Sequence, residues 1–159
     1  MKAASLTLIG WIGEEFEGVL RSVHRTLELC QKALQTGDEG YWDGVALNLH
    51  SFYTCVERIF EAIAREVDGR LPGGPDRHRD LLTQMSAEIP SIRPPVLSRE
   101  SRACLDEYRG FRHIVRHVYT FTLKPERIRA LAEGVEACLE GVERDLERFT
   151  SFLRSLGSG

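Results

Sequence analysis

Several common sequence features are missing from this chain of 159 residues. No stretch approaches the roughly 18 consecutive apolar residues of a membrane-spanning helix, and residues 1–13 do not form a convincing secretory signal. Cysteine is sparse and scattered, at Cys30, Cys55, Cys104 and Cys138. No pair has the close Cys-x2-4-Cys spacing of a structural zinc site. We therefore expect a cytoplasmic protein without metal, cofactor or membrane contact, whose cysteines are small core residues in a reducing compartment.

The alternation of apolar and polar residues that marks β-strands is also absent. Apolar residues instead recur at three- and four-residue steps, which places them on one face of a helix. The expected helices cover about 6–35, 41–67, 76–87, 99–119 and 125–156. This pattern predicts an all-α protein, an antiparallel four-helix bundle with an additional short helix, forming a single domain over residues 1–159.

The same spacing predicts which side chains face the core. In the first helix they are Phe16, Leu20, Val23, Leu27, Cys30 and Leu34. In the second they are Leu49, Phe52, Val56, Ile59, Phe60, Ile63 and Val67. In the helix at 99–119 they are Leu105, Tyr108, Phe111 or Ile114, Val115 and Val118, and in the last Ile128, Leu131, Val135, Cys138, Val142, Leu146, Phe149 and Leu153. Ser98 is the expected N-cap of the helix at 99–119.

Acidic residues are missing from one segment in particular. The whole chain has a net charge of -3, which argues against broad coating of nucleic acid. Residues 108–124, however, contain no aspartate or glutamate. Their charged and imidazole side chains are Arg109, Arg112, His113, Arg116, His117 and Lys124. A local run of cations in an acidic chain indicates a binding place for phosphate.

Within this segment lies the pattern Arg112-x4-His117-x-Tyr119. Each residue of a helix turns about 100°, so Arg112 and His117 lie about 140° apart around the axis. One straight helix does not easily aim both at a single phosphate. The helix can end or bend near His117, or two protomers can each supply part of the site, and both can hold together.

These residue types suit metal-independent cleavage of RNA. A histidine can remove the proton of a 2′-hydroxyl or protonate the leaving 5′-oxygen, and an arginine stabilises charge on the phosphoryl oxygens. No carboxylate cluster lies nearby in sequence to hold magnesium, which disfavours a two-metal nuclease. Tyr119 can bond to phosphate or itself accept a modification. His113, Arg116 and Arg109 are the expected supporting residues of the site.

Each of these residues also has a purely structural explanation. Arg109 and Arg116 can pair with nearby acids such as Asp106 and Glu107. Elsewhere, His50 and His78 are expected to serve packing or loop anchoring. Glu57 and Arg58 are expected to form an ion pair or to brace the motif helix, and none of these residues is assigned to catalysis.

Taken with its surroundings, the motif resembles that of HepT-like ribonuclease toxins of the HEPN superfamily, whose signature is Arg-x4-6-His. The segments 49–60, 72–82 and 108–113 are similar to family segments in the same order, so the resemblance covers about residues 47–123. One departure is His113, where many HepT proteins have asparagine directly after the motif arginine.

The resemblance implies a homodimeric endoribonuclease in which motif helices meet at a composite cleft. Arg112 would steady the phosphate, His117 would be the acid–base residue and Tyr119 would line the site. It also implies a target such as tRNA or mRNA and a partner, an MntA-like nucleotidyltransferase antitoxin. That antitoxin would transfer AMP to Tyr119, and the added charge and bulk would exclude RNA.

The sequence is also compatible with two other functions. The bundle can be a non-catalytic helical binding partner of a nucleotidyltransferase, with its cationic cleft holding nucleotide. It can also be a structural or regulatory helical protein whose charges only interact with solvent, in which case no salt-sensitive RNA binding is expected.

Overall fold

The computed structural model describes residues 2–117 and 123–158. Its helices are α1 (Lys2–Thr36), α2 (Gly40–Ile63), the π-helical turn η1 (Ala64–Asp68), α3 (Arg77–Ser86), α4 (Arg99–His117) and α5 (Pro125–Leu156). Across the described ranges there is no β-strand, and an isolated bridge joins Ile89 to Arg93. The prediction of an all-α bundle is therefore confirmed. Val118 and Tyr119 lie outside the described residues.

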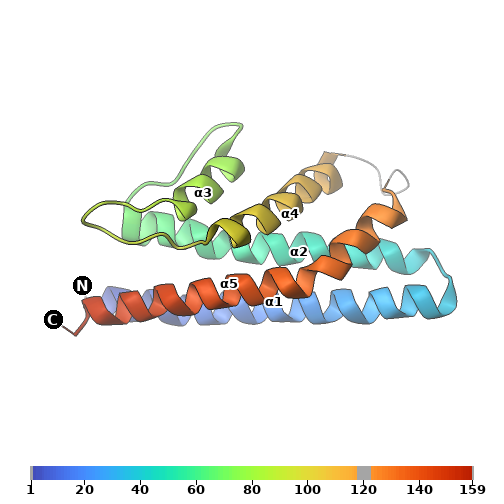
Figure 1. Ribbon diagram of the computed structural model, residues 1–159, viewed down its shortest axis with the longest axis horizontal. Coiled ribbons are helices and arrows are strands. Elements are labelled where there is room, and N and C mark those ends of the chain that lie inside the picture. Colours follow the sequence, from blue (N-terminus) through green and yellow to red (C-terminus); the bar gives the residue numbers. More distant parts are fainter. Residues whose placement is uncertain (1, 118–122, 159) are drawn as a thin grey trace.

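Figure 1 shows α1, α2 and α5 running alongside one another, with α4 over α2 and the short α3 beside α4. The chain turns from α1 into α2 at Gly37, whose φ of 71° suits glycine. Asp38 then accepts a hydrogen bond at 2.8 Å from the backbone N–H of Gly40. Gly10 and Gly13 both lie within α1, which begins at Lys2 rather than near residue 6.

The core is formed largely by the predicted faces of α2 and α5. From Leu49 to Ile63, each residue predicted to face the core is fully buried, and only Val67 of that set is half-buried. The eight residues predicted for α5 are all buried. In α4 the structure selects Phe111 rather than Ile114, and Val115 is half-buried. The spacing of apolar residues was sufficient to predict the buried faces of α2, α4 and α5, because each of these helices carries a single apolar stripe.

The predicted face of α1 is right only in part. Val23 is buried, and Phe16, Leu27 and Cys30 are half-buried against the core, but Leu20 and Leu34 are 37% and 52% exposed. The residues that α1 buries are Leu8, Ile12, Val19, Ser22, Val23, Thr26, Leu29 and Ala33. Two of them are polar, but the hydroxyls of Ser22 and Thr26 donate to backbone carbonyls one turn earlier, at 2.9 and 2.8 Å. A satisfied hydroxyl can be buried at little cost, so the face that looked less apolar is the inner one.

Contacts with α5 hold the first half of α4. The backbone N–H of Ser101 donates to the Ser98 hydroxyl at 3.2 Å, which confirms Ser98 as the N-cap. Ser98 in turn donates from its backbone N–H and its hydroxyl to the buried Asp145 of α5, at 2.9 and 3.0 Å. Further along, the Tyr108 hydroxyl donates to the carbonyl of Leu131 at 2.7 Å.

A disulfide also joins these two helices, between Cys104 and Cys138. The expectation that all four cysteines are unpaired is therefore wrong for two of them, while Cys30 and Cys55 remain free. No local pattern indicates this pair, because its members are 34 residues apart and become neighbours only when α4 packs on α5, which brings their Cα atoms to 5.9 Å.

The segment that connects α3 to α4 is fixed by one buried ion pair. Arg93 and Asp68 have side chains 0% and 1% exposed, and the Arg93 Nε–H donates to Asp68 at 2.6 Å. The other guanidinium hydrogens reach Asp68 again and the carbonyls of Ala87, Pro94 and Gln84. Because η1 ends at Asp68, this ion pair ties the end of α2 to the segment that leads into α4.

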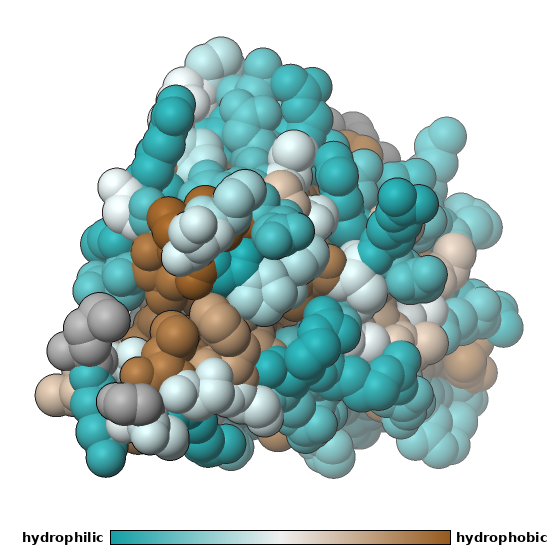
Figure 2. Space-filling model, turned by 60° about the vertical axis from the view of Figure 1, so that its left-hand side comes forward, coloured by the Kyte–Doolittle hydropathy of each residue, from teal (hydrophilic) through white to brown (hydrophobic). Residues whose placement is uncertain are grey.

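Both ends of the described chain lie at the same end of the bundle (Figure 1). A patch of hydrophobic residues is exposed on the face that Figure 2 presents, surrounded by hydrophilic ones. Exposed apolar side chains in the terminal turns include Leu6 of α1 and Leu156 of α5.

Candidate functional site

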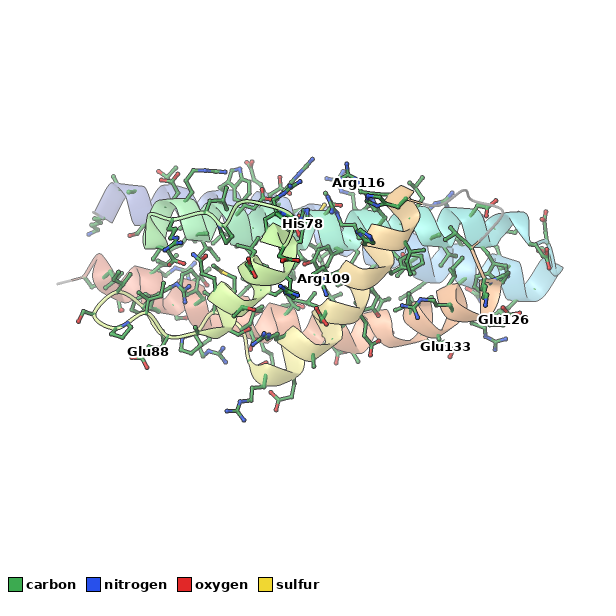
Figure 3. All side chains as sticks on the ribbon, turned by 90° about the horizontal axis from the view of Figure 1, so that it is seen from above. His78, Glu88, Arg109, Arg116, Glu126 and Glu133 are labelled. Carbon is green, nitrogen blue, oxygen red and sulfur yellow. A yellow bond between two sulfur atoms is a disulfide. The ribbon has the colours of Figure 1, made fainter. Side chains whose placement is uncertain are left out.

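A pocket of about 420 Å³ lies between the first turn of α3 and the second half of α4. Its lining consists of Pro75, Asp76, Arg77, His78, Arg79, Arg109, Arg112, His113, Arg116 and His117. Figure 3 shows His78 on α3 next to the part of α4 that carries Arg109 and Arg116. Five arginines and three histidines against one aspartate make this cavity suited to an anion.

The pocket brings together all five predicted site residues of α4. Arg109, Arg112, His113, Arg116 and His117 line it within a single chain. The 140° between Arg112 and His117 is bridged because the pocket extends from the half-buried side of α4 to its exposed side, where His117 lies. The modification residue, Tyr119, falls outside the described residues, so its position relative to the pocket stays a prediction.

Arg112 lies at the inner side of the pocket, with its side chain 13% exposed. Its Nη2 is 4.0 Å from Oε1 of Glu57, an ion-pair contact longer than a good hydrogen bond. Its Nε is buried and has no hydrogen-bond partner among the described residues. One distant carboxylate leaves several N–H donors of this guanidinium unused. The guanidinium is therefore well placed to bind two oxygens of a phosphate group.

His117 is exposed at the rim of the pocket. Its Nδ1–H donates to the carbonyl of His113 one turn earlier, at 2.8 Å. That bond fixes the tautomer, because a carbonyl can only accept, and leaves Nε2 available for proton transfer. The two imidazole rings stack, with centroids 4.2 Å apart and planes 23° from parallel. His113 therefore orients His117 through both its backbone and its ring.

Glu57 connects three helices behind this surface. It is 4% exposed on α2, and both of its carboxylate oxygens lie 2.8–2.9 Å from Nδ1 of His78 on α3. The same carboxylate faces Arg112 on α4. The expectation that Glu57 braces the motif helix agrees with this geometry, and His78 is anchored as expected. Arg58 points to solvent.

Two polar residues of α2, His50 and Tyr53, are close enough to feel the charge of the same arginine. The buried atoms of α2 without hydrogen-bond partners among the described residues are His50 Nε2, Tyr53 Oη and Thr54 Oγ1. Burial, followed by the charges of Arg112 and Arg116, lowers the pKa of His50. Burial, followed by the charge of Glu57, raises the pKa of Tyr53. Both groups are therefore held neutral behind the cationic surface.

The arginines of the pocket differ in how far they are already paired. Arg109 donates to Asp106 at 2.7 Å, so it forms the ion pair with a nearby acid that was the structural alternative for this residue. Arg79 contacts Asp76 and Asp80 at 3.2 and 4.0 Å.

Two arginines are less encumbered. Arg77 on α3 and Arg116 on α4 are exposed and form no ion pair with any other residue that the structure describes. They are the cations most available to a ligand.

The sequence did not predict that α3 forms one wall of the site. The run Pro75-Asp76-Arg77-His78-Arg79 already holds three basic or imidazole side chains in a row, a signal of the same kind as that on α4. Gly69 and Gly74, at φ of 70° and 87°, turn the chain between η1 and α3 and so carry this run back toward α4.

A model of the family described as "HepT-like protein" matches residues 44–153, more than half of the chain. This chain belongs to the HepT-like family. Neither a search of curated proteins nor a search of solved structures gave a match.

The matched region of this HepT-like protein of the HEPN superfamily includes both walls of the pocket and Glu57 behind them. None of its described helices has the length and hydropathy to cross a membrane. Within residues 2–117 and 123–158, no group of three or more His, Cys, Asp or Glu side chains is arranged to hold a metal ion.

Proposed function

We propose that this HepT-like protein is a metal-independent endoribonuclease, the toxin of a toxin–antitoxin pair. The observation that carries the proposal is the presence of Arg112 and His117 in one cationic pocket, with no hydrogen bond from any described residue to His117 Nε2. The membership of the family in a superfamily of nuclease type supports it. The RNA substrate would be tRNA or mRNA, cleaved in the cytoplasm.

The chemistry follows from the positions of these groups. A phosphodiester in the pocket would place its non-bridging oxygens against the spare donors of Arg112, with Arg116 adding charge at the open side. His117 would act as acid–base residue through Nε2, while its Nδ1–H keeps the ring oriented on the His113 carbonyl. Arg109 and His113 would support binding and orientation.

Assembly and control of the toxin extend the proposal. Two copies, each a single domain over residues 1–159 in an antiparallel four-helix arrangement, would form a homodimer. His113, Arg116 and His117 are exposed on α4 and can meet a second copy at a composite cleft. An MntA-like nucleotidyltransferase would be the antitoxin. It would add AMP to Tyr119, two residues beyond His117, and thereby block the pocket by bulk and negative charge.

Expression of single variants tests the proposal. Arg112→Ala and His117→Ala should each abolish growth arrest and lower the rate of RNA cleavage in EDTA on the order of 10²–10⁴-fold. Arg129→Ala, which removes an exposed cation of α5, is the matched control and should keep the parent rate. If the parent protein is harmless and leaves RNA intact, the non-catalytic binding partner becomes the better explanation.

The proposed modification has its own measurement. Intact mass after co-expression with a neighbouring nucleotidyltransferase should increase by one or more AMP units, and peptide sequencing should place them on Tyr119. A Tyr119→Phe protein that is still silenced and still modified contradicts this part of the proposal.

A further inference from the structure

His78 occupies an unusual position for a residue that only anchors a loop. It is the second residue of α3, and its side chain is 25% exposed although Nδ1 is bonded to the almost fully buried Glu57. The exposed part of the side chain lines the same pocket as His117.

The carboxylate of Glu57 determines which nitrogen of the His78 ring carries a hydrogen. Glu57 can only accept, so Nδ1 carries the hydrogen, and the sequence-distant pair resembles the carboxylate–imidazole pairs that orient catalytic histidines. Nε2 has no hydrogen-bond partner among the described residues, and the ring borders the cavity. His78 and His117 therefore share one arrangement, in which the protein holds Nδ1 and no described residue bonds to Nε2.

RNA cleavage without a metal requires two proton transfers. One removes the proton from the 2′-hydroxyl as its oxygen attacks phosphorus, and the other protonates the 5′-oxygen as its bond to phosphorus breaks. A single histidine cannot be the acceptor of one proton and the donor of the other in the same step.

We propose that His78 is the second proton-transfer residue of this site, the general acid, and that Glu57 is its positioning residue. This inference rests on the proposed ribonuclease function. His117 Nε2 takes the 2′-hydroxyl proton, the 2′-oxygen bonds to phosphorus, and the P–O5′ bond breaks. His78 Nε2 gives its proton to O5′, which yields a 2′,3′-cyclic phosphate and a 5′-hydroxyl end. Exchange with water returns both rings to their starting states.

The two Nδ1 partners distinguish the roles. A carboxylate supports the positive charge of an imidazolium better than a neutral carbonyl does. His78 is bonded to the carboxylate of Glu57, and His117 to the carbonyl of His113. His78 is accordingly the proton donor and His117 the acceptor. Arg112 faces Glu57 from the other side, so one buried carboxylate orients both the phosphate-binding arginine and the acid.

The test uses an RNA oligonucleotide spanning the mapped cleavage site and a second one in which sulfur replaces the leaving 5′-oxygen at that site. A thiolate leaves without being protonated, so the second substrate needs no general acid. His78→Asn is the variant of choice, because the asparagine amide can still donate to Glu57 where Nδ1 did, but it cannot transfer a proton.

The variant should cleave ordinary RNA on the order of 10²-fold or more slowly than the parent and should cleave the 5′-thio RNA at nearly the parent rate. His117→Ala should lose both activities. Glu57→Gln should slow ordinary RNA more than 5′-thio RNA. His24→Asn, a change of an exposed histidine on α1, should leave both rates unchanged.

The possible outcomes separate this inference from the proposed function. If His78→Asn slows both substrates equally, or neither, His78 is not the acid although the protein remains a ribonuclease. If the parent cleaves neither substrate, the ribonuclease function itself is refuted. Should His78→Asn not fold, shown by loss of helical circular dichroism, the Glu57→Gln comparison alone decides, since equal slowing of both substrates overturns the proposal.

Discussion

The buried ion pair between Asp68 and Arg93 gives the sharpest prediction about stability. Replacing Asp68 with asparagine preserves the size of the side chain but removes its charge. In the folded protein the carboxylate accepts hydrogen bonds from Arg93 Nε at 2.6 Å, Arg93 Nη2 at 2.8 Å and Gln84 Nε2 at 2.7 Å. An asparagine side chain has one oxygen, and its amide group would face one of these donors with a donor of its own.

The expected loss follows from burial. The Arg93 side chain is 0% exposed, so its positive charge cannot recover the lost interaction from water. Removing one partner of such a pair costs about 3–5 kcal/mol of unfolding free energy. For a chain of this length each kcal/mol corresponds to roughly 2–4 °C, so the melting temperature should fall by roughly 6–20 °C.

Urea unfolding followed by circular dichroism measures this loss, with the slope m checked for constancy between variants. Glu133→Gln on α5 is the matched control, because it breaks an exposed pair with Arg129 at 2.9 Å. That control should cost at most about 0.5 kcal/mol. A loss below about 1 kcal/mol in Asp68→Asn would refute the reasoning, because it would mean that water or another group compensates Arg93.

Three further results are expected. Reducing the disulfide, or changing Cys104 to serine, opens a link across 34 residues to Cys138 and should lower the free energy of unfolding by about 3–4 kcal/mol; an unchanged urea midpoint in reductant argues that the thiols are free in solution. Burial and two nearby arginines lower the pKa of His50 below its ordinary 6.5. Neutral His50 therefore contributes fully to the free energy of unfolding above pH 6.5, and this contribution is lost as the pH falls through the lower pKa of the folded state. Between about pH 7.5 and about pH 5.5 the urea midpoint should therefore fall less in His50→Gln than in the parent, and equal falls contradict the assignment. Arg116→Ala removes a pocket cation that forms no ion pair with a described residue, and it should reduce the salt dependence of log Kd for single-stranded RNA by roughly 0.7, whereas Arg129→Ala should not change it.

Most helices of this protein could be predicted from the sequence, because proline, glycine and the spacing of apolar residues indicate the same helix boundaries. The last helix begins at Pro125 and ends at Leu156, as its pattern predicts. The second differs in its final turn, where residues 64–68 form a π-helical turn instead of continuing the α-helix. That local widening leaves apolar spacing almost unchanged, so the sequence pattern does not reveal it.

The choice of face in α1 illustrates a limit of such patterns. This helix carries two apolar stripes, and the richer one, which includes Leu20 and Leu34, is the more exposed. Periodicity measures how apolar a face is, but burial also depends on fit. The face with Val19, Ser22 and Thr26 combines small and branched side chains with hydroxyls satisfied by the helix itself. The spacing of apolar residues does not show that a hydroxyl is satisfied by a hydrogen bond within its own helix.

The candidate site was predictable on α4 and not beyond it. Clustering of charge along one helix is visible in sequence, so Arg112 and His117 could be found. Glu57 and His78 are 21 residues apart and meet only because α2 and α3 pack together, which no local pattern encodes. Each taken alone had an adequate structural explanation. That interpretation changes because Glu57 holds a histidine that lines the pocket.

The tethering of α4 has a consequence for how this protein can diversify. Three residues bond α4 to α5 between its N-cap and its middle, namely Ser98, Cys104 and Tyr108, whereas His113, Arg116 and His117 are exposed at its other end. The contacts that hold the fold and the exposed side chains that line the pocket thus lie at opposite ends of one helix. Under the proposed function, exposed positions beside the catalytic His117, such as Arg116, can change with little effect on the free energy of unfolding, since most surface substitutions alter it by less than about 0.5 kcal/mol. We therefore expect related chains to differ most at the exposed, non-catalytic positions near the C-terminal end of α4.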